Sequence, residues 1–252
     1  MDRMIKVKMT FKGGVVDERL ARAVDVGLSL VTVDLAIFTI RNGALMVLLI
    51  ERGEEPFQGC SALPGGRVRR QETLDQGARR ELLEETGIDG SRLHLEQLGA
   101  FGDPGRDPRG RVVTIAYLAL GADLPEAVGG SDAAHAHWVP VGEILEGPLL
   151  LAFDHDRILG DALERVREKL EYTTVATVFC PEPFTLSELR EVYEVIWGRE
   201  LDPSNFRRKV TKAEGFVEPS GGQRAQRAGR PAALYRKGGS SLLTPPLLRS
   251  AS

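Results

Sequence analysis

The first half of the chain opens with closely spaced apolar runs that read as β-strands. Leu28 to Ile40 is rich in Leu, Val, Ile, Thr and Phe, and Ala44 to Ile50 is again apolar. Asn42 and Gly43 stand between the two runs, and this pair favours the positive backbone angles of a two-residue turn. The pattern predicts a β-hairpin.

A helix with well-marked ends follows a glycine-rich and proline-containing loop over residues 59–68. Thr73 with Gln76 three residues on forms a capping box, and Gly87 can adopt the left-handed conformation that ends a helix. Leu74, Ala78 and Leu82 recur every four residues, so they form one apolar stripe. We expect a helix over residues 73–86 with this stripe buried.

Further strands are predicted at 95–101, 111–120 and 137–139, with an Arg- and Asp-rich loop at 102–111. Strands and helices alternate without the rhythm of a parallel β-α-β fold, which indicates an α/β (α+β) architecture with a mixed sheet. Asp154 then starts a helix that runs to about Glu171. We place the change of domain here.

The next elements come in the order of a winged helix-turn-helix. Thr185 and Glu188 form a second capping box for a helix that stops at Gly198, and Asp202 with Pro203 starts another helix that runs to about Glu214. Two short strands, 216–219 and 231–237, flank a basic, glycine-rich tip. The predicted organisation is an irregular lead-in over 1–27, a first domain over 28–150, a winged helix over 151–237 and a disordered tail over 238–252.

Composition narrows the class of protein. The chain has 252 residues, two cysteines and a net charge of −3, and it contains neither a secretory leader pattern nor an apolar run long enough to span a membrane. We therefore expect a cytoplasmic protein that does not contact membranes. From Arg199 onward there are eleven basic and four acidic residues, so this end carries +7 and the first 198 residues carry −10. Such a split is typical of a module that binds a polyanion, although a solvated basic tail would give the same charge.

Three carboxylates lie on one face of the 73–86 helix. Glu81, Glu84 and Glu85 are three and four residues apart, where like charges repel unless a cation offsets them. Hard oxygen ligands suit Mg²⁺ or Mn²⁺, which can bridge the oxygens of a diphosphate. Gly65 and Gly66 leave bare backbone beside this face. The alternatives are a solvated acidic helix and a pocket floor that binds a diphosphate without cutting it.

The spacing around these residues resembles the signature box of the Nudix hydrolases. The matching positions are Gly66, Glu72, Arg80, Glu81, Leu82, Glu84, Glu85, Gly87 and Ile88. The resemblance implies a mixed-sheet α/β/α sandwich, with Glu81, Glu84 and Glu85 as metal ligands and Arg80 holding the carboxylates in place. It also implies a catalytic base outside the box, for which Glu126 and Asp132 are equal candidates.

Arginines near the box could bind phosphate groups through paired hydrogen bonds. We select Arg52, Arg106 and Arg111 as candidate ligand-binding residues, with Gly65 and Gly66. A salt-bridged, solvated loop would explain each arginine equally well. The remaining candidates for chemistry are interpreted as structural: His135, His137, His155, Cys60 and Cys180.

The helix that starts at Pro203 has two contrasting sides. At about 100° per residue, Phe206, Val210 and Ala213 share one side, and Arg and Ser/Thr residues share the other. This arrangement suits a helix that reads the DNA major groove, while a plain basic surface helix is the alternative. The predicted DNA-binding residues on the helix and the wing are Ser204, Asn205, Arg207, Arg208, Thr211, Lys212, Arg224, Arg227 and Arg230.

Several longer segments resemble the Nudix-related transcriptional regulators of the NrtR type, among them LAFDH (151–155) and GRPAALYR (229–236). The resemblance implies an ADP-ribose-responsive repressor of NAD metabolism genes that binds a palindromic double-stranded operator as a homodimer. ADP-ribose or a related nucleotide would be the effector. Because the glutamate box is intact, a Mg²⁺-dependent ADP-ribose pyrophosphatase with an appended DNA-binding domain is the alternative.

Overall fold

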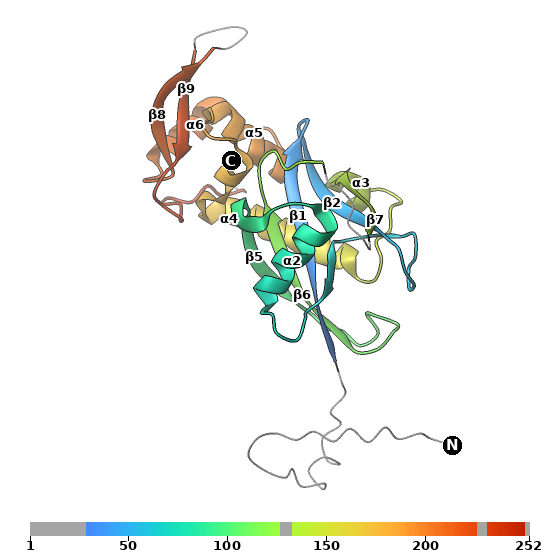
Figure 1. Ribbon diagram of the computed structural model, residues 1–252. Helices are drawn as coiled ribbons and strands as arrows, with labels where there is room; N and C mark the ends of the chain where they lie inside the picture. Colours follow the sequence, from blue (N-terminus) through green and yellow to red (C-terminus); the bar gives the residue numbers. More distant parts are fainter. Residues whose placement is uncertain (1–28, 127–132, 226–230, 250–252) are drawn as a thin grey trace, which may run out of the picture.

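The computed structural model describes residues 29–126, 133–225 and 231–249, and Figure 1 shows how their elements are arranged. The predicted lead-in over 1–27 lies outside these ranges. A sheet with flanking helices forms one end of the molecule, and a small helical domain with a two-stranded wing forms the other. No helix within these ranges has both the length and the apolar character that crossing a bilayer requires.

The sheet of the first domain is mixed, as the sequence predicts. Among the described residues it has seven strands in the order β3-β2-β1-β6-β5, with β4 paired to β1 and β7 to β2. β1 and β6 are parallel and the other pairs are antiparallel. The strands are β1 (Leu30–Arg41), β2 (Ala44–Arg52), β3 (Ser61–Ala62), β4 (Gly65–Arg67), β5 (His94–Phe101), β6 (Val112–Leu120) and β7 (Ala133–Pro140).

Local signals placed the first elements correctly. Asn42 and Gly43 both have positive φ, 51° and 75°, and they join β1 to β2 as a tight hairpin. The glutamate helix α2 (Leu74–Thr86) begins with the Thr73–Gln76 capping box and ends at Gly87, whose φ is 70°. The strand predicted at 137–139 is longer in the structure, because it pairs with β2 from Ala133 to Pro140.

Helices cover both faces of the sheet, which confirms the α/β/α sandwich. Alternate residues of β1 point to opposite sides, as strand geometry requires. Val33 and Leu35 pack with Ala78 of α2, whereas Phe38 belongs to the core on the other side. That second core contains α3 (Val141–Leu145) and α4 (His155–Tyr172).

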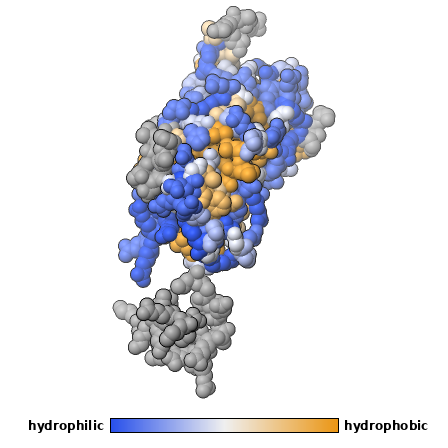
Figure 2. Space-filling model, turned by 90° about the vertical axis from the view of Figure 1, so that its right-hand side faces the viewer, coloured by the Kyte–Doolittle hydropathy of each residue, from blue (hydrophilic) through white to orange (hydrophobic). Residues whose placement is uncertain are grey.

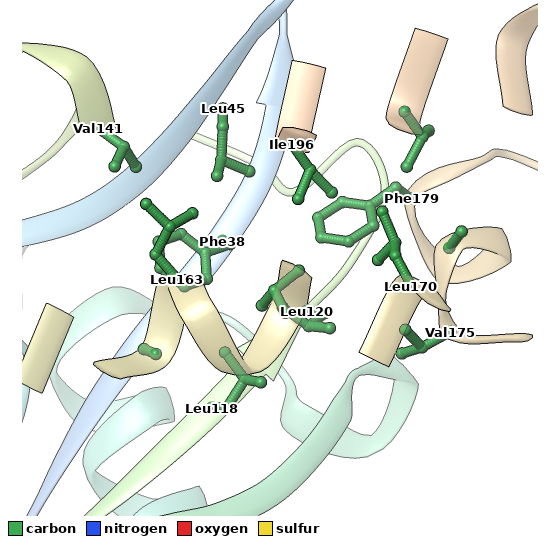
Figure 3. Packing of buried hydrophobic residues seen from close by; sticks show 14 of the residues in the cluster. Phe38, Leu45, Leu118, Leu120, Val141, Leu163, Leu170, Val175, Phe179 and Ile196 are labelled. Carbon is green, nitrogen blue, oxygen red and sulfur yellow. The ribbon is translucent and has the colours of Figure 1, made fainter. Parts of the chain in front are cut away.

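Helix α4 packs against both domains. Figure 3 shows Leu163 beside Phe38 of the sheet, and Leu170 close to Phe179 and Ile196 of the helical domain. A short 3₁₀ segment, η2 (Thr174–Phe179), links α4 to α5 (Leu186–Trp197). The predicted boundary at residue 151 therefore falls before a helix that belongs to the cores of both domains.

The winged helix has the expected order of elements. α5 starts at the Thr185–Glu188 capping box, and α6 (Pro203–Lys212) starts at Asp202, whose side chain accepts from the Asn205 amide. Helix α6 ends two residues earlier than predicted. The wing consists of β8 (Val217–Arg224) and β9 (Ala232–Lys237), so β8 extends into the segment predicted to be the tip.

The prediction of a disordered tail is wrong for residues 238–249. This segment returns to α4, where the amides of Leu243 and Leu247 donate to the carbonyls of Tyr172 and Glu171. Both leucine side chains are buried in the core that joins the two domains. The composition, rich in Gly, Ser and Pro, concealed the two apolar anchors, because two leucines are too few to establish a periodic pattern.

The tail anchors generate the first prediction. Leu243→Ala should lower the free energy of unfolding by about 2–4 kcal/mol, since it leaves a cavity in a shared core. Leu242→Ala is the matched control: its side chain is 61% exposed, against 5% for Leu243, so we expect a change within about 0.5 kcal/mol. Chemical denaturation followed by circular dichroism measures both. Equal effects of the two substitutions would contradict the structure.

Candidate functional site

A polar cleft of about 500 Å³ opens between the sheet, α2 and the first turn of α4. Its walls include most of the residues selected from the sequence, brought together from separate segments. The predicted residues that line it are Arg52, Gly65, Gly66, Arg80, Glu81, Glu84, Glu85 and Arg106. The cleft also includes residues that the sequence interpretation did not select: Asp34, Arg69, Arg109, Phe153 and His155.

Arg80 organises the carboxylates of α2. Its guanidinium donates to Glu72 at 2.6 Å, to Glu81 at 2.7 Å and to Glu84 at 2.9 Å. The same group also donates to the carbonyl of Arg67, which fixes it against β4. The hydrogen bonds from Arg80 lower the pKa of Glu72 to about 2 and also lower the pKa of Glu84. The predicted role of Arg80 as the residue that holds the carboxylates agrees with this geometry.

Glu81 and Glu85 reach the glycine pair of β4. Glu81 is buried, and this burial raises the pKa of its carboxyl. A Cβ added to Gly66 would lie 2.4 Å from its Oε1. Glu85 accepts a hydrogen bond from the Gly65 amide at 2.8 Å. Only a glycine at position 66 allows the β4 backbone to approach the Glu81 carboxylate this closely.

The donor set fits a hard divalent cation by its chemistry. Three carboxylates and a bare backbone lie along one wall, and one of the carboxylates, Glu81, is buried. In the described part of the chain, however, no three His, Cys, Asp or Glu side chains are arranged as a metal site. Arg80 and Arg69 take up oxygens of Glu81 and Glu84 instead. The assignment of Glu81, Glu84 and Glu85 as metal ligands stays a prediction.

A second group of cleft residues is basic and comes from β2 and the 102–111 loop. Arg106 is nearly buried, with a side chain 4% exposed, and it donates twice to Asp154 at 2.9 and 2.5 Å. The same guanidinium lies 3.6 Å from Asp34. Arg52 lies over the Phe153 ring, 4.6 Å from its centroid. No local pattern points to Asp34 or Asp154 as partners of Arg106, because both are distant from it along the chain.

One of the three arginines selected from the sequence lies elsewhere. Arg111 donates to the carbonyl of Gly102 across the base of its own loop and is not among the residues that line the cleft. Arg109 lines it instead and is fixed by Asp107 at 2.6 Å. An alternation of Arg and Asp in a loop does not reveal which guanidinium faces inward.

The histidine that begins α4 is a structural residue that also lines the cleft. His155 is buried, and its Nδ1 accepts from the Leu63 amide at 3.0 Å. Burial lowers the pKa of the ring, which favours the neutral form with the proton on Nε2. That nitrogen lies 3.6 Å from Asp34. The two candidate bases gain no support here, since Glu126 pairs with Arg41 outside the cleft and Asp132 lies outside the described residues.

The second candidate site is the outer face of α6. Phe206 and Val210 are buried, and Phe206 packs on Tyr193 of α5 with ring centroids 5.3 Å apart. The opposite side is open to solvent, as predicted. Its exposed residues are Ser204, Arg207, Arg208, Thr211 and Lys212, and Asn205 is half-buried beside Arg208.

The structure of the wing tests only part of the prediction of a basic tip. Arg224 donates to Glu188 and to the carbonyl of Pro183, so it anchors β8 to the start of α5 and part of its charge is offset. No local pattern predicts this contact, because Arg224 and Glu188 are 36 positions apart along the chain. Arg227 and Arg230 lie outside the described residues.

A Nudix sandwich followed by a winged helix with an exposed basic helix defines a Nudix-related regulator. The NUDIX domain model matches residues 30–161, and that of the NrtR DNA-binding winged helix domain matches residues 177–236. The ADPR responsive transcriptional repressor NtrR of Acinetobacter baylyi is 40% identical over 210 residues, which cover 82% of this chain and 81% of that protein. The chain therefore belongs to the NrtR family.

Two further proteins are similar to one or both domains. The crystal structure of Shewanella oneidensis NrtR complexed with a 27mer DNA matches with a TM-score of 0.72 and 36% identity, over 82% of this chain and 93% of that one. An ADP-ribose pyrophosphatase of Methanocaldococcus jannaschii is 39% identical over 117 residues, or 46% of this chain and 64% of the enzyme. The first match spans both domains, whereas the second is confined to about half of the chain.

The glycine pair generates the second prediction. A Cβ at Gly65 would lie 2.2 Å from the Val33 carbonyl oxygen, so Gly65→Ala must push β4 away from β1 and should cost about 1–3 kcal/mol of stability. Gly160→Ala, in the middle of α4 with nothing within 4 Å, should instead gain about 0.5–1 kcal/mol. Urea denaturation compares the two. A neutral Gly65→Ala would mean that the strands do not approach this closely.

Proposed function

We propose that this chain is an ADP-ribose-responsive transcriptional repressor, in which the cleft binds the nucleotide and α6 binds operator DNA. The observation that carries the proposal is the coexistence, in one chain, of a cleft with carboxylate and arginine walls and an exposed basic helix face. The Acinetobacter relative is named for a response to ADPR, and the Shewanella relative was crystallised with DNA. Both properties support the same assignment here.

The two walls of the cleft suit the two parts of a nucleoside diphosphate sugar. Arginine side chains such as Arg52 and Arg109 match the geometry of phosphate oxygens. On α2, Glu81, Glu84 and Glu85 would hold Mg²⁺ or Mn²⁺. A bound divalent ion would screen the carboxylates from the diphosphate and neutralise its charge. The Nudix domain itself supports dependence on a divalent metal.

The winged helix would place α6 in the major groove of a palindromic operator. Arg207 and Arg208 lie opposite the buried Phe206, so they can reach base edges or phosphates while the apolar side stays packed. Two copies would be needed for a two-fold operator. Figure 2 shows hydrophobic surface across the middle of one face, which supports association as a homodimer.

The genes controlled would be those of NAD metabolism, since ADP-ribose is a breakdown product of NAD. Binding both DNA and this nucleotide would place the repressor in the cytoplasm. When ADP-ribose occupies the cleft, we expect DNA affinity to fall, which requires the ligand to bind the DNA-free conformation more tightly than the DNA-bound one.

The DNA assignment generates the third prediction. Arg207→Ala/Arg208→Ala should weaken binding to a DNA duplex taken from the region upstream of the gene that encodes this chain. We expect a loss of at least 100-fold, because two exposed cations leave the interface. Arg70→Ala/Arg157→Ala removes the same charge from exposed positions outside residues 177–236, the range that matches the winged helix model, and should change the affinity less than threefold. Fluorescence anisotropy at fixed salt measures both, and unchanged affinity in the first variant would exclude α6 as the reading helix.

A second candidate function is hydrolysis of ADP-ribose by the same cleft. It is favoured by the intact glutamate box and by the position of Glu85, which lines the cleft and accepts a hydrogen bond from the Gly65 amide. The similar pyrophosphatase supports this candidate for the first domain alone. Glu126 pairs with Arg41 outside the cleft, so Asp132, which lies outside the described residues, stays the candidate for the catalytic base.

Glu85→Gln is the fourth prediction and separates the two functions. If the cleft cuts ADP-ribose, the wild type should release AMP with Mg²⁺ or Mn²⁺, and Glu85→Gln should reduce the rate by at least 100-fold because the site loses a charged ligand. Glu146→Gln, on an exposed residue just after α3, controls for the loss of one carboxylate. A wild type that releases DNA on adding ADP-ribose but forms no AMP would exclude the hydrolase.

A further inference from the structure

We infer that the Arg106–Asp154 ion pair is the contact through which occupancy of the cleft is transmitted along α4 to the DNA-binding domain. This inference rests on the proposed function and names how the two sites are coupled. The first observation is that Asp154 does not act as a helix cap. Asp154 stands at the N-cap of α4, yet its side chain makes no capping hydrogen bond and instead accepts both hydrogen bonds from Arg106.

Arg106 belongs to the cleft, whereas Asp154 does not. Arg106 lines the cleft together with Phe153 and His155, whereas Asp154 is not among the lining residues. Asp154 occupies the edge of the Arg106 guanidinium formed by Nε and Nη2. A phosphate group that takes this same edge offers the same paired acceptor geometry and therefore displaces the carboxylate. Binding of a diphosphate is therefore expected to weaken the contact that holds the start of α4.

The backbone is strained at Phe153, directly before Asp154. Such strain is expected where a segment can switch between two conformations. Phe153 has φ = 58°, an unusual conformation for a bulky residue without a glycine's freedom. It is followed directly by Asp154 and His155, so the strained residue, the ion pair and the first helical residue are consecutive. Release of the ion pair would allow this segment to relax.

The far end of α4 is fixed to the winged helix. The Trp197 indole donates to the Arg167 carbonyl at 3.2 Å, Arg167 donates back to the Ile196 carbonyl at 3.0 Å, and the Tyr193 hydroxyl donates to the Leu170 carbonyl at 3.1 Å. Tyr193 also packs on Phe206 of α6. A helix of 18 residues is about 27 Å long, so a shift at the cleft would reach the DNA-binding helix through one rigid element.

A neighbouring ion pair provides a matched control. Arg157 on the first turn of α4 donates to Asp103 in the same 102–111 loop, at 2.5 Å. Both partners are largely exposed, 58% and 70%, and neither lines the cleft. Asp103→Asn therefore removes a bond between the same two segments without touching the cleft, while Asp154→Asn removes the pair that we assign to coupling.

The test measures DNA affinity by anisotropy with and without saturating ADP-ribose, and ADP-ribose affinity by calorimetry. Wild type and Asp103→Asn should lose at least tenfold in DNA affinity when ADP-ribose is added. Asp154→Asn should still bind DNA alone and ADP-ribose alone. Its DNA affinity, however, should change less than twofold when ADP-ribose is added. A tenfold or larger response in Asp154→Asn would overturn the inference, whereas a wild type that binds ADP-ribose without any change in DNA affinity would overturn the proposed function itself.

A second measurement covers the case in which Asp154→Asn does not fold. Hydrogen exchange of the wild-type protein should become faster at the amides of the first turn of α4, residues 155–158, when ADP-ribose is added. The amides of α2 outside the cleft serve as the internal reference. Unchanged exchange in the first turn at saturating ADP-ribose would overturn the inference without any variant.

Discussion

Burial of α4 on two sides is the constraint on which the rest of the structure depends. Its apolar residues pack against the sheet of the Nudix domain and, further along, against α5 and η2 of the winged helix, within a single continuous core. The tail extends this core, since Leu243 and Leu247 are buried in it. Burial on both sides stabilises the helix through tertiary packing. The two sites therefore belong to one cooperative structure rather than to two bodies joined by a linker.

The cleft is held together by opposite charges. Carboxylates crowd one side of α2, which would be unfavourable without cations, and Arg80 supplies the compensation in the structure described here. On the other wall, Arg106 is nearly buried and requires an anionic partner, which Asp154 supplies. Each wall thus carries charge that is internally balanced and that a metal ion or a diphosphate could compete for.

Whether a contact in this structure is predictable from the sequence depends on how far apart its two residues lie along the chain. Thr73, Thr185 and Asp202 cap helices through neighbours three residues away, so their patterns were readable and are confirmed. The three candidate metal ligands follow from a spacing on one helix, and all three line the cleft. By contrast, the bond between Arg106 and Asp154 spans 48 positions, and Arg224 reaches Glu188 across 36. Such partners are set by tertiary packing, which no local pattern contains.

The proposed function requires that one molecule binds ADP-ribose and DNA at separate sites, and that each ligand weakens the binding of the other. The most direct measurement is the affinity of the wild-type protein for ADP-ribose in the presence and absence of saturating operator duplex. Because coupling between two binding sites is reciprocal, the account predicts that operator DNA weakens ADP-ribose binding by the same factor as ADP-ribose weakens DNA binding, about tenfold or more. Equal ADP-ribose affinity with and without bound operator would contradict it.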